Sequence, residues 1–237
     1  MSRQKIRKAL IIISFLLFPI VIFYFSPYLI ALGASEGIIA GSFFIFTGVF
    51  VLSLFFGRLF CGWMCPVAGL EEALFSVNDK KIKKGNWIKF LIWVPWIVLI
   101  VFLFYLAGGI KGIDFFFHSE DVVSLTDPLS YIIYYAVLIL VVVPTLILGK
   151  RAFCHHICWI SPFMIIGRKI RNIFKYPSLR LIADESKCIN CKICDKNCPM
   201  SLDVNDMVMS GNMEHSECIL CGNCIDTCPK KAIRFGF

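Results

Sequence analysis

Long apolar runs separated by short polar segments fill the first two thirds of the chain. Four of these runs span residues 9–32, 37–56, 87–106 and 129–148. Each is long enough to cross the roughly 30 Å hydrocarbon core of a bilayer, which takes about 20 helical residues. Three of the runs contain prolines, which membrane helices tolerate better than soluble helices do; they are Pro19, Pro27, Pro95 and Pro144. The pattern predicts an α-helical membrane protein with four transmembrane helices.

The composition agrees with this prediction. Of the 237 residues, 58% are hydrophobic, and the mean hydropathy is +0.78. A soluble domain of this size could not bury so much apolar surface. We therefore expect lipid to be a partner of the chain.

Lys and Arg residues are unevenly distributed between the two sides of the predicted membrane. They cluster before the first run, between the second and third runs, and after the fourth run. The two connections on the other side contain one such residue, Lys111. Because cytoplasmic loops carry the excess of Lys and Arg, we expect both termini and the C-terminal domain to be cytoplasmic.

The net charge of +8 divides unequally along the chain. Residues 1–183 carry 18 Lys and Arg against 8 Asp and Glu, whereas residues 184–237 carry 6 against 8. The basic excess therefore belongs to the membrane part, and the C-terminal segment is slightly acidic. Without a basic strip on that segment, nucleic acid is not an expected partner.

Eight of the twelve cysteines form two repeats of C-x2-C-x2-C-x3-C followed by proline. This is the pattern of bacterial ferredoxins with two [4Fe-4S] clusters, in which the fourth cysteine of each repeat ligates the other cluster. One cluster would be held by Cys188, Cys191, Cys194 and Cys228, and the other by Cys218, Cys221, Cys224 and Cys198. Zinc sites use four ligands in two pairs, and disulfides fit an oxidising compartment. The spacing therefore predicts a small α+β ferredoxin domain.

A second pair of motifs follows the second and fourth apolar runs. Both have the form Arg-x-Phe-Cys-x3-Cys, and they contain Cys61 and Cys65, and Cys154 and Cys158. The two halves of the membrane part, each with two apolar runs and one motif, therefore look like a duplication of a two-helix unit. Cysteines four residues apart share one face of a helix, so neighbouring helix ends would bring four thiols together. These cysteines could ligate a third iron–sulfur cluster or another metal, act as redox-active thiols, or be small buried hydrophobic residues.

Three further features allow more than one interpretation. His155 and His156, inside the second motif, could be ligands or proton donors, but a solvated basic turn is favoured. Residues 161–180 alternate apolar and basic positions, which suits either a helix on the inner leaflet or a linker. The outer loop, with Asp114, Phe115–Phe117, His118, Glu120 and Asp121, could contact a quinone, but a loop folded back on the membrane is favoured. A haem is not expected, because no histidine lies within an apolar run.

We therefore divide the chain into three parts. Residues 1–160 form a four-helix transmembrane domain with two CxxxC motifs. Residues 161–183 form an interfacial, basic, amphipathic linker. Residues 184–237 form a ferredoxin domain with two [4Fe-4S] clusters.

This order of spans, CxxxC(P) motifs and ferredoxin cysteines resembles the NapH-type membrane ferredoxins of prokaryotes over nearly the whole chain. The same module is also similar to parts of the nitrous-oxide-reductase regulator family and of the copper-reducing oxidase-assembly family. The resemblance rests on the ferredoxin cysteines and on the first motif, FCGWMCP. It implies electron transfer between quinol and a partner enzyme, in a direction that stays open, and it makes Cys61, Cys65, Cys154 and Cys158 the motif cysteines. Trp159 departs from the pattern by occupying the position of the motif proline.

The leading hypothesis is a membrane-bound iron–sulfur protein that passes electrons between the quinone pool and a redox partner protein. It would be an electron carrier or a subunit of a quinol-linked oxidoreductase, and no catalytic residue is predicted. A second hypothesis is a reductase that delivers electrons to a metal ion or corrinoid through the CxxxC thiols. A third is a scaffold subunit whose clusters hold a complex together.

Overall fold

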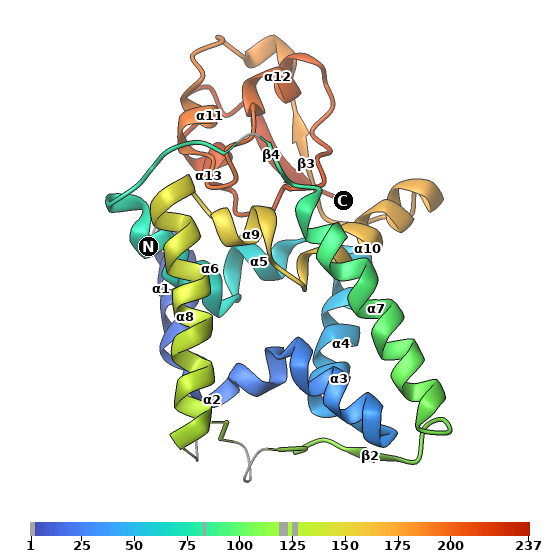
Figure 1. Cartoon of the computed structure of the whole chain (residues 1–237). Coiled ribbons are helices and arrows are strands. Elements are labelled where there is room, and N and C mark those ends of the chain that lie inside the picture. The colour runs from blue at the N-terminus through green and yellow to red at the C-terminus, as the bar shows by residue number, and fades with distance from the viewer. Residues whose placement is uncertain (1–2, 83, 119–122, 125–127) are drawn as a thin grey trace.

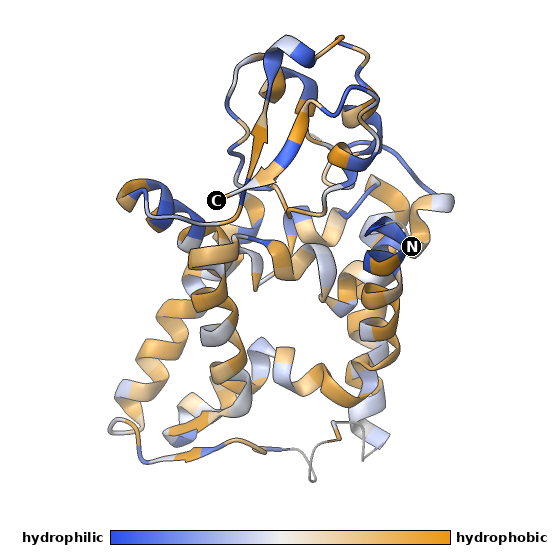
Figure 2. Ribbon diagram, turned by 180° about the vertical axis from the view of Figure 1, so that it is seen from behind, coloured by the Kyte–Doolittle hydropathy of each residue, from blue (hydrophilic) through white to orange (hydrophobic). Residues whose placement is uncertain are grey.

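The structure, a computed structural model, describes residues 3–82, 84–118, 123–124 and 128–237. It consists of a helical part and a small domain that sits at one end of the helices (Figure 1). Both chain termini lie at the end that carries this domain. The helices are predominantly apolar along their length, whereas the small domain is mixed in character (Figure 2).

The first predicted span is not a single helix. It consists of α1 (Arg3–Leu16), α2 (Phe18–Val21), the 3-10 turn η1 (Ile22–Phe25) and α3 (Pro27–Glu36). The axis bends by 56° between α1 and the segment Phe18–Phe25. Pro19 lies in the first turn of α2, and Ser26 caps α3 by accepting a hydrogen bond from the Leu29 N–H. Proline and a capping serine both favour helix starts, so the apolar run is divided into short helices.

The second predicted span is shorter than expected. It begins with the strand β1 (Ile38–Ala40) and continues as α4 (Gly41–Phe56), a helix of 16 residues. At 1.5 Å per residue, such a helix extends about 24 Å. By contrast, α7 (Ile88–Leu106) and α8 (Pro128–Leu148) remain helical through Pro95 and Pro144. Among the described residues, two helices are long and apolar enough to cross a membrane, or three if α1 and the segment after it form one bent span.

The outer loop folds back against the helices where the structure describes it. The strand β2 (Gly112–Asp114) pairs in parallel with β1. Phe115 then packs its ring against Tyr24 and Phe44. Glu120 and Asp121, which belonged to the same prediction, lie outside the described residues.

Short helices connect the long ones to the small domain. They are α5 (Leu59–Trp63), α6 (Pro66–Ala73), the turn η2 (Leu74–Ser76), α9 (Ala152–His156) and α10 (Ser161–Phe174). The predicted helix within residues 161–180 is therefore present as α10, which ends where Lys175 adopts a left-handed conformation. It packs along α4. Its last two residues, Ile173 and Phe174, remain exposed.

The small domain has the α+β character predicted for a ferredoxin. It contains β3 (Arg180–Ala183), the turn η3 (Glu185–Lys187), α11 (Ile193–Asn197), α12 (Val204–Met209), α13 (Asn223–Asp226) and β4 (Ile233–Gly236). The two strands are antiparallel, with Arg180 opposite Gly236 and Ala183 opposite Ile233. They join the beginning and the end of the domain, which we call the ferredoxin domain (residues 180–237).

We predict that the close packing of α6 on α1 is sensitive to one methyl group. A Cβ atom added at Gly69 would lie 2.2 Å from the Ile11 carbonyl oxygen, whereas one at Gly48 in α4 would meet nothing within 4 Å. Gly69→Ala should therefore destabilise the protein by about 1–3 kcal/mol, and Gly48→Ala should be neutral or slightly stabilising because alanine favours helices. Thermal unfolding in detergent would measure both. A Gly69→Ala protein as stable as the parent would contradict this packing.

Candidate functional site

Two cavities in the ferredoxin domain are each lined by four cysteines. The cavity nearer the helical part, here the inner cavity, is lined by Cys198, Cys218, Cys221 and Cys224. The outer cavity is lined by Cys188, Cys191, Cys194 and Cys228. Each cavity thus combines three cysteines of one motif with the fourth cysteine of the other motif. This is the arrangement that the spacing predicts.

The backbone around the two cavities repeats with a period of 30 residues. Three positions with positive φ in the first half have counterparts in the second: Asn190 and Leu220, Lys192 and Gly222, and Ser201 and Lys231. Left-handed residues of this kind turn successive N–H groups toward a concavity that binds anions, as in many iron–sulfur sites. One such bond is present, from the Ala232 N–H to the Cys228 Sγ at 3.4 Å. Thiols and inward N–H groups together fit the anionic, thiolate-ligated clusters that this cysteine pattern binds.

A third cavity lies within the helical part, beside the two CxxxC motifs. It has a volume of about 250 Å³ and is almost entirely apolar. The cysteines of both CxxxC motifs line it: Cys61, Cys65, Cys154 and Cys158. Its remaining walls come from the broken segment Phe18–Tyr28, from α8 and from aromatic residues next to the motifs. The four thiols are buried and all face one space, as expected if the ends of the two helices are neighbours.

The two CxxxC motifs have the same local structure. In each, the second cysteine donates its N–H to the carbonyl of the phenylalanine before the first cysteine, at 3.0 Å for Cys65 and 2.9 Å for Cys158. The arginine three residues before the first cysteine is also fully buried in both, at Arg58 and Arg151. Within the described ranges, no three His, Cys, Asp or Glu side chains lie close enough to hold a single metal ion.

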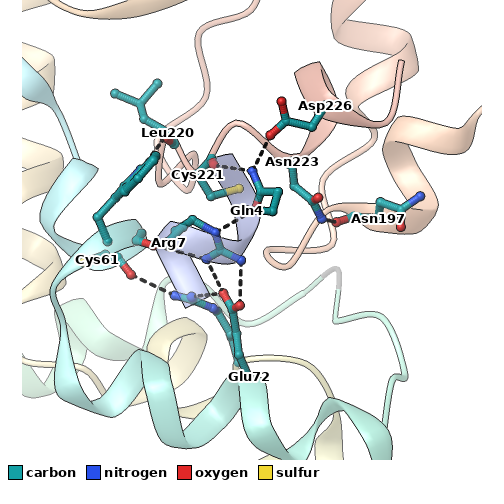
Figure 3. Close-up of polar contacts among 12 residues, drawn as sticks. Gln4, Arg7, Cys61, Glu72, Asn197, Leu220, Cys221, Asn223 and Asp226 are labelled. Atoms are coloured by element: carbon teal, nitrogen blue, oxygen red, sulfur yellow. Dashed lines mark hydrogen bonds and ion pairs between the residues drawn. The ribbon is translucent and has the colours of Figure 1, made fainter. Parts of the chain in front are cut away.

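Arg7 and Glu72 (Figure 3) form a buried charge cluster with Arg151 beside the first motif. Both terminal nitrogens of Arg7 donate to Glu72 at 2.7 Å, and Arg151 donates to the same carboxylate. Arg7 also donates to the Gly62 carbonyl, and Arg151 to the Cys61 carbonyl, each at 3.1 Å. The surrounding guanidinium groups outweigh the effect of burial and lower the pKa of Glu72. This cluster fixes the backbone of the first motif.

A second charge cluster joins the helices to the ferredoxin domain. Glu217, next to Cys218, accepts hydrogen bonds from Arg58 at 2.7 Å and from Lys89 at 2.6 and 2.8 Å. All three side chains are at most 2% exposed. Burial raises the pKa of Glu217, but the attraction of the two cations is stronger and lowers it to about 2. The carboxylate therefore stays charged between its two partners.

The first CxxxC motif packs directly on the second ferredoxin motif. A Cβ atom added at Gly62 would lie 2.4 Å from the Ile219 carbonyl oxygen, so only glycine permits this contact. The Trp63 indole donates to the Leu220 carbonyl at 3.1 Å, and Gln4 donates to the Cys221 carbonyl at 3.0 Å (Figure 3). The backbones of these two motifs are therefore in direct contact. On one side of the contact Cys61 lines the apolar cavity, and on the other side Cys221 lines the inner cavity.

Glu71 is a buried carboxyl group next to the second motif. It is fully buried, and it accepts hydrogen bonds from the Cys154 thiol at 2.8 Å, the Phe153 N–H at 3.0 Å and the Thr145 hydroxyl at 3.2 Å. Burial raises the pKa of Glu71, although the positive charge of Arg151 acts to lower it. Glu71 thus links α6 to α8 and α9 behind the cysteines.

The solvated basic turn predicted for His155 and His156 is wrong for His155. His155 is 1% exposed, and its Nδ1 contacts the Asn86 side-chain oxygen. Burial, together with the charges of Lys89 and Arg58, lowers its pKa to about 3 despite the attraction of Glu217. A neutral, buried imidazole therefore replaces the expected charged one.

Comparisons with known proteins agree with this arrangement. A family described as a 4Fe-4S binding domain matches residues 39–85 and again residues 131–177. The same family thus matches the segment around each CxxxC motif, as a repeat of these segments would give. A family described as a 4Fe-4S dicluster domain matches residues 180–229. No solved structure matches the chain.

Relatives match most of the chain. An uncharacterised protein of Methanocaldococcus jannaschii is 29% identical over 78% of this chain and 67% of its own length. The electron transport protein YccM of Escherichia coli is 23% identical over 85% of this chain and 57% of its own length. The ferredoxin-type protein NapH of Haemophilus influenzae is 25% identical over 79% of this chain and 67% of its own length.

The chain is similar to the NapH-type ferredoxins over most of its length. The resemblance seen in the sequence is thereby confirmed, and iron–sulfur binding follows from the matched 4Fe-4S families. In this NapH-like chain, the family matches cover both CxxxC motifs as well as the ferredoxin cysteines.

Sequence reasoning missed the charged residues that hold this NapH-like site together. They are Arg7, Arg58, Glu71, Glu72, Lys89, Arg151 and Glu217. A signal was present for two of them, because Arg58 and Arg151 occupy matched positions in the motifs. Glu71 and Glu72 also stand out as adjacent acids within the apolar stretch that follows the first motif.

We predict that Glu217→Gln strongly destabilises the attachment of the ferredoxin domain. The substitution leaves Arg58 and Lys89 buried without a counter-charge, which should cost about 3–5 kcal/mol. Asp79→Asn is the matched control, because Asp79 is 78% exposed and lies 3.8 Å from Lys150; it should cost at most about 1 kcal/mol. Denaturant unfolding, followed by limited proteolysis between the two parts, would compare them. Equal stability of the two variants would contradict the prediction.

Proposed function

We propose that this protein carries electrons between the membrane quinone pool and a redox partner protein. The observation that carries the proposal is the arrangement of three cysteine-lined cavities, with the apolar cavity next to the inner cavity and the outer cavity beyond it. The names of relatives such as YccM and NapH, an electron transport protein and a ferredoxin-type protein, support it.

Two [4Fe-4S] clusters would be held in the ferredoxin domain by the crossed sets of cysteines. Clusters of this type supply one-electron chemistry when bound, at a potential set by their surroundings. Cys188, Cys191, Cys194 and Cys228 would ligate the outer cluster, and Cys198, Cys218, Cys221 and Cys224 the inner one. The matched dicluster family and the two cavities support this assignment.

The four CxxxC cysteines would hold a third iron–sulfur cluster or another metal. The match of a 4Fe-4S family to both motifs supports this reading over redox-active thiols or simple packing. Burial raises the pKa of the Cys65, Cys154 and Cys158 thiols, and the buried charges of Arg58 and Arg151 oppose that rise. The short helices α5 and α9 present the two pairs of thiols to a common space.

The apolar cavity would bind the quinone. Its lining is apolar and aromatic with few polar groups, which suits an apolar ring. Ser26 and Tyr28, on the broken segment after α1, are among the polar side chains that line it. Oxidation of a quinol there would release two protons to solvent and two electrons, which leave singly through the protein. Cys61, Gly62 and Ile219 would provide the path toward the inner cavity.

We also propose four membrane crossings with the ferredoxin domain in the cytoplasm. In this topology α4 forms a short span, and the segments α1 to η1 form a bent one. The end of the helical part that carries the ferredoxin domain also carries most of the Lys and Arg outside the spans. That distribution supports the cytoplasmic assignment by the positive-inside rule.

We expect quinol to reduce the purified protein and a filled cavity to prevent it. Val137→Trp places a large side chain in the lining of the apolar cavity, whereas Val143→Trp on the same helix changes a residue that does not line it. With anaerobic protein in nanodiscs, a menaquinol or ubiquinol analogue should bleach the visible iron–sulfur absorbance. Val137→Trp should slow this bleaching roughly tenfold, in line with the loss of a well-formed pocket.

Reduction by dithionite is the control and should be unchanged in both tryptophan variants.

Iron analysis separates the cluster assignments. About twelve iron atoms per chain indicates a third [4Fe-4S] cluster, and Cys61→Ser should lower the iron content to about eight atoms per chain. The proposal would fail if dithionite bleached the protein and no quinol did. It would also fail if the chain contained no iron.

A second prediction concerns the contact between the first CxxxC motif and the second ferredoxin motif. Gly62→Val would push the first CxxxC motif away from Ile219, so the quinol-driven reduction of the ferredoxin-domain clusters should slow roughly tenfold, as small displacements do at reacting centres. Iron content and midpoint potentials should stay unchanged. Gly48→Val, in open space on α4, is the matched control. Stopped-flow absorbance would measure the rates, and equal rates in the two variants would exclude this path.

A further inference from the structure

The two cavities of the ferredoxin domain differ in their access to solvent. The inner cavity is covered by the helical part, because Ile219 and Leu220 are buried against Gly62 and Trp63. The outer cavity opens at the surface, where Cys191 is exposed. α11, which carries part of this cavity, lies farther from the helices than α13 does (Figure 1). An electron that enters or leaves at the protein surface would therefore pass through the outer cavity.

Half of the acidic residues of the ferredoxin domain are paired with cations outside the domain or buried, and these pairs lie where the domain meets the helices. Three of its eight carboxylates pair with cations of the helical part and α10, and a fourth is buried within the domain. The pairs are Glu214 with Arg168, Glu217 with Arg58 and Lys89, and Asp226 with Arg3. The buried carboxylate is that of Asp195, which accepts a hydrogen bond from the Asn205 N–H. The negative charge counted in the sequence is thus neutralised at the interface.

The surface that remains is basic. Seven Lys and Arg residues stand against the four other carboxylates of the domain. Lys187 and Lys230 line the outer cavity itself, although Lys187 also pairs with Asp184. Lys192 precedes α11 next to Cys191 and is exposed. Lys192 and Lys230 therefore place positive charge at the cavity that is open to solvent, beside the Lys187–Asp184 pair.

Apolar side chains lie at the centre of this basic surface. Ile189 is 57% exposed and Ile193 is 40% exposed, and both line the outer cavity beside Cys191. An apolar centre with a charged rim is the usual anatomy of a protein interface. We name this surface the outer face; it is formed by Lys187, Ile189, Cys191, Lys192, Ile193 and Lys230.

We propose that the outer face docks a small acidic protein that carries a one-electron centre. The rim of lysines would steer such a partner and set its orientation, while the two isoleucines would exclude water at the contact. Each encounter transfers one electron, so that the partner's centre is oxidised as an iron–sulfur centre of the domain is reduced, or the reverse. No bond or proton is transferred. The proposal rests on the proposed function and adds the chemistry of the partner.

A pair of haem proteins with opposite charge tests the proposal. The full chain in nanodiscs is reduced with dithionite, freed of excess reductant and mixed by stopped flow with acidic cytochrome b5 or with basic cytochrome c. The rate with cytochrome b5 should exceed that with cytochrome c at low salt and should fall as salt is added. The double variant Lys192→Glu and Lys230→Glu should slow the reaction with cytochrome b5 roughly tenfold at low salt and accelerate that with cytochrome c.

The matched control reverses two exposed lysines of α10 and its end, Lys169→Glu and Lys175→Glu. This control should leave both rates unchanged. Ile189→Ser should slow the reaction with cytochrome b5 to a similar degree at low and high salt, because the contact it removes is apolar. Equal effects of the two double variants, or a faster reaction of the parent with cytochrome c, would overturn the docking proposal.

The two proposals can fail separately. If quinol does not reduce an iron-loaded protein, the quinone assignment fails, and the docking experiment still proceeds from dithionite. If quinol reduces the protein but the charge-reversed variant reacts normally with cytochrome b5, the docking surface alone is wrong. Absence of iron would overturn both.

Discussion

The structure depends on a backbone-to-backbone contact between the first CxxxC motif and the second ferredoxin motif. Gly62 meets Ile219 without a side chain between them, and the Trp63 indole holds the next carbonyl. Such a contact tolerates little displacement, because carbonyl oxygens and Cα atoms cannot adjust as side chains can. The ferredoxin domain is therefore a fixed part of the protein, and its inner cavity keeps one position relative to the apolar cavity.

Buried charges maintain this contact, and they also explain the charge of the free surface. Arg7 and Arg151 share Glu72, while Arg58 and Lys89 share Glu217. Each carboxylate thus has two cations, which leaves positive charge near the cysteines that bind anionic centres. The same pairing removes carboxylates from the outward surface of the ferredoxin domain. A domain that is acidic by composition can therefore present a basic face to a partner.

The sequence predicted those features whose cause is local. Ferredoxin cysteines must be spaced two and three residues apart to surround a cluster, so their sequence spacing indicates which of them line each cavity. Hydropathy predicted that residues 9–32 are apolar, but not that Pro19 and Ser26 divide them into α1, α2 and α3. The charge clusters could not be predicted, because Glu217 lies 159 residues from Arg58 and no local pattern links them. His155 was misjudged for the same reason, since its burial depends on the ferredoxin domain and on Asn86.

The departure of the second motif from the first has a structural explanation. Pro66 follows Cys65 directly and begins α6, whereas the corresponding helix α10 begins later, with Pro162 in its first turn. Trp159, at the position of the motif proline, instead donates its indole N–H to the Phe25 carbonyl at 3.0 Å. This bond holds the end of the broken segment against the apolar cavity. Each half therefore supplies two cysteines and part of the cavity wall, but they hold Phe25 differently, the first by stacking Phe60 on its ring and the second by the Trp159 hydrogen bond.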